Sequence, residues 1–178
     1  MITNPKENRK NVHFVSAPPT EKIKDRALVF GTFDIIHPAH LRFLIEARLA
    51  TKCKDCDLVV VLARDSSIER IKGRKPIFHE TQRLRLISGL RIVDFARLGN
   101  EGENPFQVIL EVEPDYIVLG YDQLIDEKPL QDFIKKHNLK ISICRLPKYE
   151  SGDLSSSSDV RERVLENWFV EKNNAAKE

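Results

Sequence analysis

Hydrophobic residues gather in five short runs along the chain, separated by longer stretches of mixed polarity. One run, Leu58 to Leu62, contains only leucine and valine, which is typical of a parallel strand buried on both faces. We expect strands at Arg26 to Gly31, Leu58 to Leu62, Val93 to Leu98, Tyr116 to Leu119 and Ile141 to Arg145, with the last as an edge or final strand.

Between these runs, apolar residues recur every three or four positions, which predicts helices. The first helix follows Gly31 and places Leu41, Leu44, Ile45 and Leu49 on one face. Further helices are expected from about Glu80 to Leu90, shortly after the turn sequence GNEGENP, around Leu130, Phe133, Ile134 and His137, and over Asp159 to Phe169, where Val160, Val164 and Trp168 share a face. The basic segment KGRKPIF between the second strand and the second helix is expected to be a loop.

Strands that alternate with helices predict a doubly wound parallel α/β sheet, a Rossmann-like fold, because parallel strands need crossover connections. Ligands bind such sheets outside the carboxyl ends of the strands. The polar segments GTFDIIHPAH, RDSSIERIKGRKP and GYDQ all follow predicted strands, so we expect them around one crevice. We divide the chain into a polar N-terminal extension (1–25), a folded domain (26–170) and a polar tail (171–178).

Composition narrows the range of functions. The 178 residues suit one domain, and a net charge of +2 gives no reason to expect a nucleic-acid-binding surface. No apolar stretch approaches the roughly 20 residues needed to cross a bilayer, and MITNPKENRK lacks the apolar segment of a signal peptide, so we expect a cytoplasmic protein without membrane contact. Three cysteines argue against a disulfide framework, and the pair Cys53 and Cys56 has no second pair to complete a zinc site, so this pair is interpreted as structural.

The segment GTFDIIHPAH carries the most specific chemistry. His37 and His40 lie between a predicted strand and a predicted helix, and Pro38 suits the first helical turn. Backbone amides and the positive end of the helix dipole attract phosphate there, and imidazoles can donate hydrogen bonds to it. The alternative is that each histidine only hydrogen-bonds a turn, but two histidines in this context favour a phosphate site.

Two further segments carry charge or hydroxyl groups. The KGRKP segment holds Lys72, Arg74 and Lys75, which are either a solvated loop or, beside a triphosphate, its ligands. In SSSSDVRER, Asp159 followed by Glu162 predicts a capping box, and the preceding serines are either further caps or phosphate contacts.

GTFDIIHPAH resembles the (G)xFDxxHxGH signature of the nucleotidylyltransferase superfamily, whose members transfer a nucleoside monophosphate from a triphosphate to a phosphate-bearing acceptor. VLARDSSIERIKGRKPIF, the QR of Gln82 and Arg83, LGYDQ and SSSSDV are similar, in order, to the archaeal-type FAD synthetase family of FMN adenylyltransferases. The resemblance runs from about Arg26 to Phe169.

This resemblance implies ATP and FMN as substrates, with a divalent cation, expected to be Mg²⁺, held by the phosphates and by no protein ligand cluster. His37, His40 and Lys72 would be catalytic, and Arg74 and Lys75 would contact phosphate or acceptor. The nucleotide-binding residues would be Gly31, Thr32, Phe33, His37, Pro38, Ala39, His40, Gly120, Asp122, Ser156 and Ser157. Related cytidylyltransferases also suggest a homodimer.

Two alternatives stay open. Arg91 to Asp94 is similar to the RYVD segment of glycerol-3-phosphate cytidylyltransferases, which would make an alcohol phosphate the acceptor. The family pattern has glycine where this chain has Ala39, so a non-catalytic nucleotide- or flavin-binding protein is the other alternative. A methyl group there would either push the phosphates away or be tolerated by a small loop shift.

Overall fold

A computed structural model describes residues 21–51, 55–102, 104–123, 125–148 and 154–175. Its strands are β1 (Arg26–Gly31), β2 (Asp57–Leu62), β3 (Phe95–Leu98), β4 (Tyr116–Leu119) and β5 (Ser142–Arg145). Its helices are α1 (Pro38–Leu49), α2 (Asp65–Lys72), α3 (Glu80–Ser88), α4 (Gln107–Val112), α5 (Glu127–Lys136) and α6 (Ser157–Ala175). All five predicted strands are present, with ends that differ by two residues at most.

The sheet has the strand order β3-β2-β1-β4-β5, and every neighbouring pair is parallel. This is the predicted doubly wound sheet, with β5 at one edge. The chain reverses its direction of travel across the sheet between β1 and β4, and this switch point is where a doubly wound fold leaves a crevice for a ligand. The first segment of interest, GTFDIIHPAH, leaves β1 at that point.

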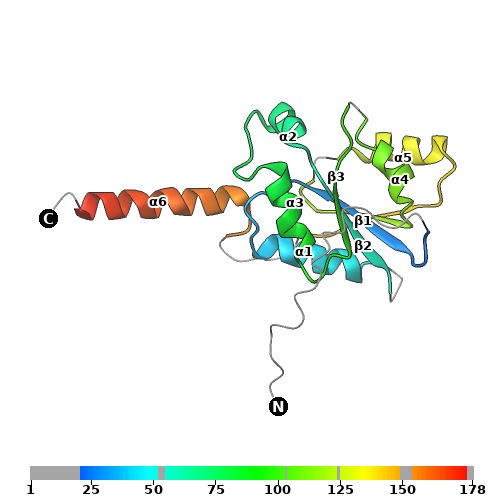
Figure 1. The fold of residues 1–178 in the computed structure, drawn as a ribbon, viewed down its shortest axis with the longest axis horizontal. Coiled ribbons are helices and arrows are strands. Elements are labelled where there is room, and N and C mark those ends of the chain that lie inside the picture. Colours follow the sequence, from blue (N-terminus) through cyan, green and yellow to red (C-terminus); the bar gives the residue numbers. More distant parts are fainter. Residues whose placement is uncertain (1–20, 52–54, 103, 124, 149–153, 176–178) are drawn as a thin grey trace, which may run out of the picture.

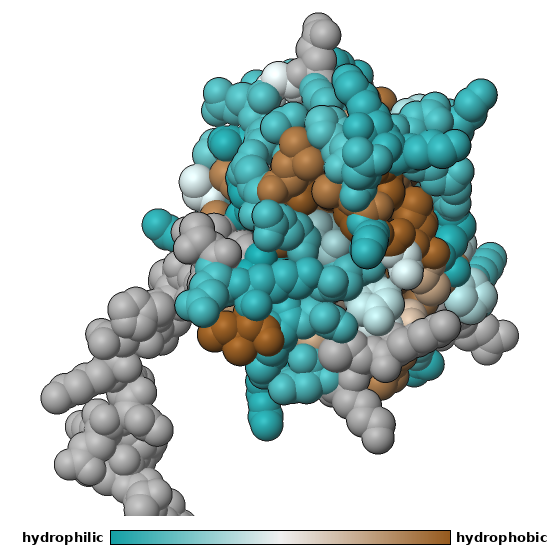
Figure 2. All heavy atoms as spheres, turned by 90° about the vertical axis from the view of Figure 1, so that its right-hand side faces the viewer, coloured by the Kyte–Doolittle hydropathy of each residue, from teal (hydrophilic) through white to brown (hydrophobic). Residues whose placement is uncertain are grey.

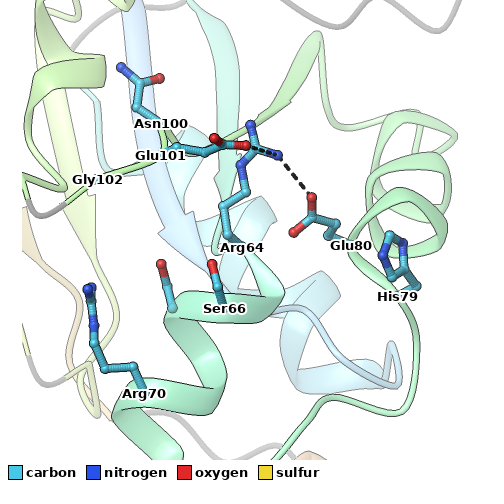
Figure 3. A pocket seen from close by; sticks show the side chains of 9 residues that line it. Arg64, Ser66, Arg70, His79, Glu80, Asn100, Glu101 and Gly102 are labelled. Carbon is cyan, nitrogen blue, oxygen red and sulfur yellow. Dashed lines mark hydrogen bonds and ion pairs between the residues drawn. The ribbon is translucent and has the colours of Figure 1, made fainter.

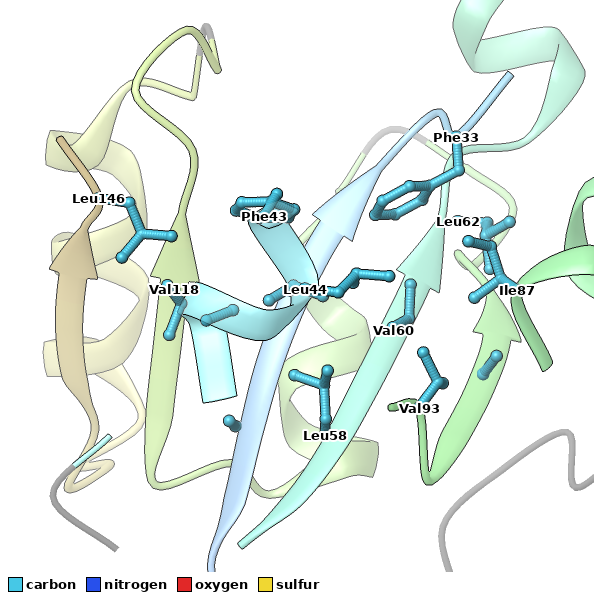
Figure 4. Packing of buried hydrophobic residues seen from close by; sticks show 14 of the residues in the cluster. Phe33, Phe43, Leu44, Leu58, Val60, Leu62, Ile87, Val93, Val118 and Leu146 are labelled. Atoms are coloured by element: carbon cyan, nitrogen blue, oxygen red, sulfur yellow. The ribbon is translucent and has the colours of Figure 1, made fainter. Parts of the chain in front are cut away.

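Two apolar layers cover the sheet. On one face α1 and α3 pack over Val29, Val60 and Val118, as Figure 4 shows in part. On the other face Val108 and Ile109 of α4, with Leu130 of α5, pack over alternate positions of the same strands. Because side chains of a strand alternate between its faces, β2 is apolar and buried from Leu58 to Leu62, as predicted for a strand buried on both sides. Two covered faces hold the carboxyl ends of the strands in fixed register.

The buried face of α1 differs from the predicted one. Leu44 is fully buried as expected, but Leu49 is 70% exposed and Leu41 is also exposed. Phe43 and Ala47 take the inner positions instead. The apolar spacing correctly predicted a helix. The predicted apolar face, however, is rotated by about one position from the face that contacts the sheet.

Helix α2 lies in the polar segment RDSSIERIKGRKP, in which no helix was predicted, and ends where the expected loop KGRKPIF begins. Ile68 is its only buried residue, so the segment lacks the apolar stripe on which a helix prediction depends. Its ends are fixed locally: Gly73 ends the helix with φ of 65°, and the Asp65 and Glu80 carboxylates each accept the other residue's backbone N–H. This helix turns the KGRKP segment back towards β1.

Helix α6 begins one turn before the predicted capping box. Ser156 accepts a hydrogen bond from the Asp159 backbone N–H, and Asp159 accepts one from the Ser156 backbone N–H. The capping box is therefore formed by Ser156 and Asp159, and the prediction that Asp159 caps the helix with Glu162 was wrong. The helix also continues to Ala175, past the boundary expected at residue 170.

In Figure 1, α6 leaves the α/β body from the side near α1, whereas α4 and α5 lie on the opposite side. That opposite side is mostly hydrophilic, with hydrophobic side chains visible in patches between polar ones (Figure 2). Within the described ranges, no helix combines the length and the apolar character that crossing a membrane requires.

Leu44 and Leu49 provide a test of the packing of α1. Leu44→Ala removes a fully buried side chain and should lower the free energy of unfolding by about 2–5 kcal/mol. Leu49→Ala, at an exposed position of the same helix, should change it by less than about 0.5 kcal/mol. Urea unfolding of both variants measures the difference, and equal losses would contradict the observed orientation of α1.

Candidate active site

The loop after β1 is tightly folded. Phe33 turns its ring back over Gly31, so that a Cβ atom at Gly31 would lie 2.5 Å from the ring. Phe33 and Ile35 both have φ near +50°, a conformation that side chains other than glycine rarely adopt. The buried Phe33 side chain packs with Phe43 of α1 and so holds this strained path. The loop therefore delivers its polar groups to fixed positions.

His37 and His40 meet at the start of α1. His37 is the residue before the first helical turn, Pro38 follows it as expected, and the two imidazole rings lie with their centroids 3.8 Å apart. The Nδ1 atoms of both rings are buried and have no hydrogen-bond partner among the described residues. Two adjacent imidazoles with unused hydrogen-bonding capacity, at a helix N-terminus, form a site suited to an anionic oxygen.

Burial keeps both rings neutral. Desolvation lowers the pKa of His37, and the Asp159 carboxylate opposes this effect. Desolvation is the main cause that lowers the pKa of His40 from 6.5 to about 3, and the nearness of His37 and of the Lys72 ammonium, which disfavours a second positive charge there, adds to it. Near neutral pH each ring is uncharged and carries one N–H, which can donate a hydrogen bond to a phosphate oxygen.

Asp34 organises the loop and was not singled out by the sequence analysis. Its side chain is buried and accepts hydrogen bonds from the backbone N–H groups of Ile77 (2.9 Å) and Phe78 (3.0 Å). It also forms an ion pair with Arg161 of α6, while its backbone carbonyl accepts a hydrogen bond from the Ser157 hydroxyl. One residue thus joins the histidine loop, the segment before α3 and the first turn of α6.

Arg83 forms a second junction beneath the site. Its fully buried guanidinium donates to the carbonyls of Thr32 and Ala63, which follow β1 and β2, and pairs with Asp65 at 2.7 Å. Arg64 pairs with Glu80 at 2.9 Å. The family resemblance drew attention to Arg83, but its structural role was visible only once the ends of the two strands were placed together.

The basic segment after α2 reaches the site through one residue. The Lys72 ammonium lies 3.1 Å from the Thr32 hydroxyl. Partial burial and the neighbouring charge of Arg74 lower the pKa of Lys72, which is the expected effect of gathering cations where no anion is bound. Arg74 and Lys75 extend into solvent and make no hydrogen bond or ion pair with another described residue.

The GYDQ segment closes the other side of the crevice. Gln123 bridges two strands, since its side chain accepts from the Gly120 N–H and donates to the Phe30 carbonyl. Arg145 donates to the Gly120 carbonyl at 2.8 Å. The Asp122 carboxylate is near enough to Lys72 to oppose the fall in its pKa. Gly120 and Asp122 therefore lie on the β4 side of the switch point, and Lys72 lies on the β1 side.

The serines at the start of α6 have partners of their own. Ser156 caps the helix and Ser157 hydrogen-bonds to the histidine loop. Arg161, one turn later, points to the same loop, and its Nε atom is buried without a partner among the residues described. Arg161 was missed by the sequence analysis, because its contact with the histidine loop joins residues more than a hundred positions apart.

The comparison with protein families fits this geometry. The cytidylyltransferase-like family model matches residues 28–163, a range that includes the histidine loop, Lys72, the GYDQ segment and the first turn of α6. The chain belongs to the cytidylyltransferase-like family.

Individual relatives of this cytidylyltransferase-like chain cover most of its length. It is 47% identical to a protein named FAD synthase from Thermoplasma volcanium, over 79% of this chain and 94% of the relative. It is 45% identical to a FAD synthase from Methanohalophilus mahii over the same shares. The fold is similar to a crystal structure titled lipopolysaccharide core biosynthesis protein, also from Thermoplasma volcanium, with 44% identity and a TM-score of 0.64 over 71% of this chain and 99% of that one.

The departure from the family pattern at Ala39 causes no backbone strain. Ala39 is the second residue of α1 and is buried, and a helical position accepts alanine without cost. The cytidylyltransferase-like RIVD segment, Arg91 to Asp94, lies at the opposite end of the sheet from the histidines. There Asp94 accepts a hydrogen bond from the Leu58 N–H and pairs with Arg48, so its position indicates a structural role.

A hollow of about 430 Å³ lies beside α2. Its lining mixes charges of both signs, as Figure 3 shows for Arg64, Arg70, Glu80 and Glu101. In this cytidylyltransferase-like protein, Arg64 pairs with both glutamates.

Cys56 is buried, with its sulfur 3.2 Å from the Thr51 hydroxyl, whereas Cys53 lies outside the described residues. Cys144 is half-buried on β5. No group of three potential metal ligands occurs in the described part of the chain.

The lowered pKa of His40 predicts a dependence of stability on pH. Below pH 6.5 the unfolded chain takes up a proton at His40, but the folded protein does not until about pH 3, so folding loses stability as the pH falls. Between pH 7.5 and 5.5 this loss should reach about 1.4 kcal/mol, and His40→Asn should abolish it. Urea unfolding of both proteins at the two pH values measures the difference, and an identical pH dependence would show that His40 titrates normally.

Proposed function

We propose that this protein is an FMN adenylyltransferase, which transfers AMP from ATP to FMN and releases FAD and pyrophosphate. The observation that carries the proposal is the 47% identity to a FAD synthase over 94% of that protein. The crevice adds physical support, because it combines paired neutral histidines, a helix N-terminus and an unneutralised lysine. These groups suit a reaction between phosphates.

In this reaction a phosphate oxygen of FMN attacks the α-phosphorus of ATP, and the bond between that phosphorus and the bridging oxygen breaks in line. The electron pair leaves with pyrophosphate. The attacking phosphate is already ionised at neutral pH, so the protein needs neither a covalent intermediate nor a strong base. Positioning and charge stabilisation therefore carry most of the catalysis.

His37 and His40 would donate hydrogen bonds to the α-phosphate as charge develops on it. The lowered pKa values of both histidines fit this role. A neutral imidazole donates a hydrogen bond to the α-phosphate but adds no positive charge that would bind the nucleotide tightly before the reaction. Lys72 would stabilise the departing pyrophosphate, joined by the exposed side chains of Arg74 and Lys75, which are free to approach it. The N-terminus of α6, with Ser156 and Ser157, would direct its backbone amides to the same phosphates.

The nucleoside would occupy the crevice between the ends of β1 and β4. Gly31, Thr32 and Phe33 would line one side through the backbone, as would Pro38 and Ala39 at the start of α1. Gly120 and Asp122 would line the other side. Arg161 would exchange part of its contact with Asp34 for a phosphate, since its Nε atom has no partner among the described residues.

A divalent cation, expected to be Mg²⁺, would arrive with the triphosphate and neutralise its charge. Asp34 is already saturated by two N–H groups and Arg161, whereas the Asp122 carboxylate, which lies near Lys72, would be able to approach such an ion. The partners would be small molecules rather than nucleic acid, the compartment the cytoplasm and the assembly a homodimer.

The function is tested by incubating the purified protein with Mg²⁺ and either ATP or CTP, each with FMN or glycerol 3-phosphate. Pyrophosphate release and FAD formation, the latter followed by chromatography, should appear together with ATP and FMN. Turnover only with CTP would contradict the proposal in favour of a cytidylyltransferase. Tight nucleotide binding without turnover would favour a binding protein.

The same assay tests the role of His40. His40→Ala should lower kcat by about 10²–10³-fold, equivalent to about 2.7–4 kcal/mol, with a much smaller effect on ATP affinity. His137→Ala, which changes an exposed histidine at the end of α5, is the matched control and should keep the activity. Equal losses of turnover and affinity in His40→Ala would contradict a role confined to the transition state.

A further inference from the structure

Arg145 lies against the GYDQ segment (Gly120–Gln123) at the carboxyl end of the sheet. It is the last residue of β5 and is paired in register with Leu119, the last residue of β4, so its side chain starts beside the first residue of the segment. Its Nη1 atom donates to the carbonyls of Gly120 (2.8 Å) and Gln123 (3.1 Å). One guanidinium group therefore joins the two ends of the GYDQ segment.

The same guanidinium also fixes the chain that leaves the segment. Its Nη2 atom donates to the Ile125 carbonyl at 3.2 Å, and its Nε atom pairs at 2.7 Å with the Glu127 carboxylate, in the first turn of α5. Most of the N–H donors of Arg145 are thus engaged, and a carboxylate balances its charge. The side chain is therefore suited to holding the backbone in place rather than to binding a phosphate.

Gln123 holds the GYDQ segment from within. Its side chain accepts from the Gly120 N–H and donates to the Phe30 carbonyl in β1, and its backbone N–H donates to the Gly120 carbonyl at 3.3 Å. Between these anchors the side chains of Tyr121 and Asp122 are exposed. The backbone of the segment is therefore fixed at both ends, while the side chains at its tip are accessible to a ligand.

We propose that Arg145 is a positioning residue that sets the affinity for the nucleoside part of the nucleotide, by holding the GYDQ segment in its binding conformation. The inference rests on the proposed function, which places the nucleoside beside Gly120 and Asp122. A segment that is already ordered spares the ligand the cost of ordering it. If the segment is ordered for only a fraction of the time, the dissociation constant rises in inverse proportion to that fraction.

The phosphate part of the affinity should not depend on Arg145. The triphosphate is assigned to Lys72 and to the N-terminus of α6, which lie on the β1 side of the crevice. The contacts of Arg145 are all with β4, α5 and the chain between them. A change at Arg145 should therefore separate nucleoside binding from phosphate binding.

Arg145→Lys removes the shape of the side chain and keeps its charge. A guanidinium is a planar fork that reaches several carbonyls in fixed directions, whereas a lysine ammonium is a single nitrogen on a flexible stem. The variant therefore loses most of the carbonyl contacts without leaving Glu127 beside an uncharged group.

Isothermal titration calorimetry in the presence of Mg²⁺, with ATP and separately with inorganic tripolyphosphate, tests the inference. Arg145→Lys should raise the ATP dissociation constant by about tenfold, as expected if the GYDQ segment is then ordered for about one tenth of the time. The constant for tripolyphosphate should stay within about twofold of the wild-type value. In turnover with FMN, the KM for ATP should rise while kcat is kept, because the variant leaves the contacts of His37 and His40 unchanged.

Arg97→Lys is the matched control. Arg97 lies in β3, at the opposite edge of the sheet, where it pairs with Glu111 at 2.7 Å and donates to the Asn100 side chain at 2.8 Å. This change should leave the ATP dissociation constant as it is. Glu127→Gln weakens the ion pair of Arg145 but keeps its carbonyl contacts, so it should raise the constant much less than Arg145→Lys does. Circular dichroism and urea unfolding confirm that each variant is folded under the conditions of the titration.

Three results would overturn the inference. One is an ATP dissociation constant that Arg145→Lys leaves unchanged, another is an equal rise in Arg97→Lys, and the third is an equal weakening of ATP and tripolyphosphate binding, which indicates a general structural role.

The titration needs no turnover, so the proposed function is judged separately. A wild-type protein that binds ATP without forming FAD would contradict the proposed reaction, and the effect of Arg145→Lys on ATP binding would still decide the inference. If the wild-type protein binds CTP instead, the same tenfold rise is expected with CTP. A wild-type protein that binds neither nucleotide would overturn the inference.

Discussion

The buried Asp34 carboxylate holds three stretches of chain, far apart in the sequence, against the carboxyl end of the sheet. It accepts the amides of Ile77 and Phe78 and pairs with Arg161. A carboxylate in such a buried position is stable only when its oxygens are paired, so each of these contacts depends on the others. The histidine loop, the approach of the KGRKP segment and the start of α6 are consequently fixed together.

The electrostatics of the crevice follow from this assembly. The histidines are packed closely enough to stay neutral, while the exposed Lys72 side chain lies beside other cations and its pKa is lowered. The free protein therefore concentrates donors and positive charge that it does not neutralise itself. In the proposed reaction a nucleoside triphosphate would supply the missing negative charge, so a local site would bind a polyphosphate although the net charge of the chain is only +2.

The strands of the parallel sheet could be predicted from the sequence, because each of the five apolar runs is short and is separated from the next by a helical pattern, so each run could only be a buried strand. Prediction from the sequence failed at α2, where burial of Ile68 alone cannot produce a helical pattern, and at the first turn of α6, where several adjacent serines could each serve as the cap.

Within the site, the histidines were recognisable from their spacing beside a strand. Asp34 and Arg161 were not, because they act through contacts between residues more than a hundred positions apart. No periodicity in the chain indicates such a pair. Only the placement of α6 beside the histidine loop brings it together.

Amide hydrogen exchange at Ile77 and Phe78 tests the organising role of Asp34 most directly. In Asp34→Asn, a neutral amide cannot serve both N–H groups and Arg161, so both amides should exchange at least about tenfold faster than in the wild-type protein. The amide of Val60 in β2 should keep its protection, which shows that the sheet is intact. Unchanged exchange at Ile77 and Phe78 would contradict the claim that the Asp34 carboxylate holds the site together.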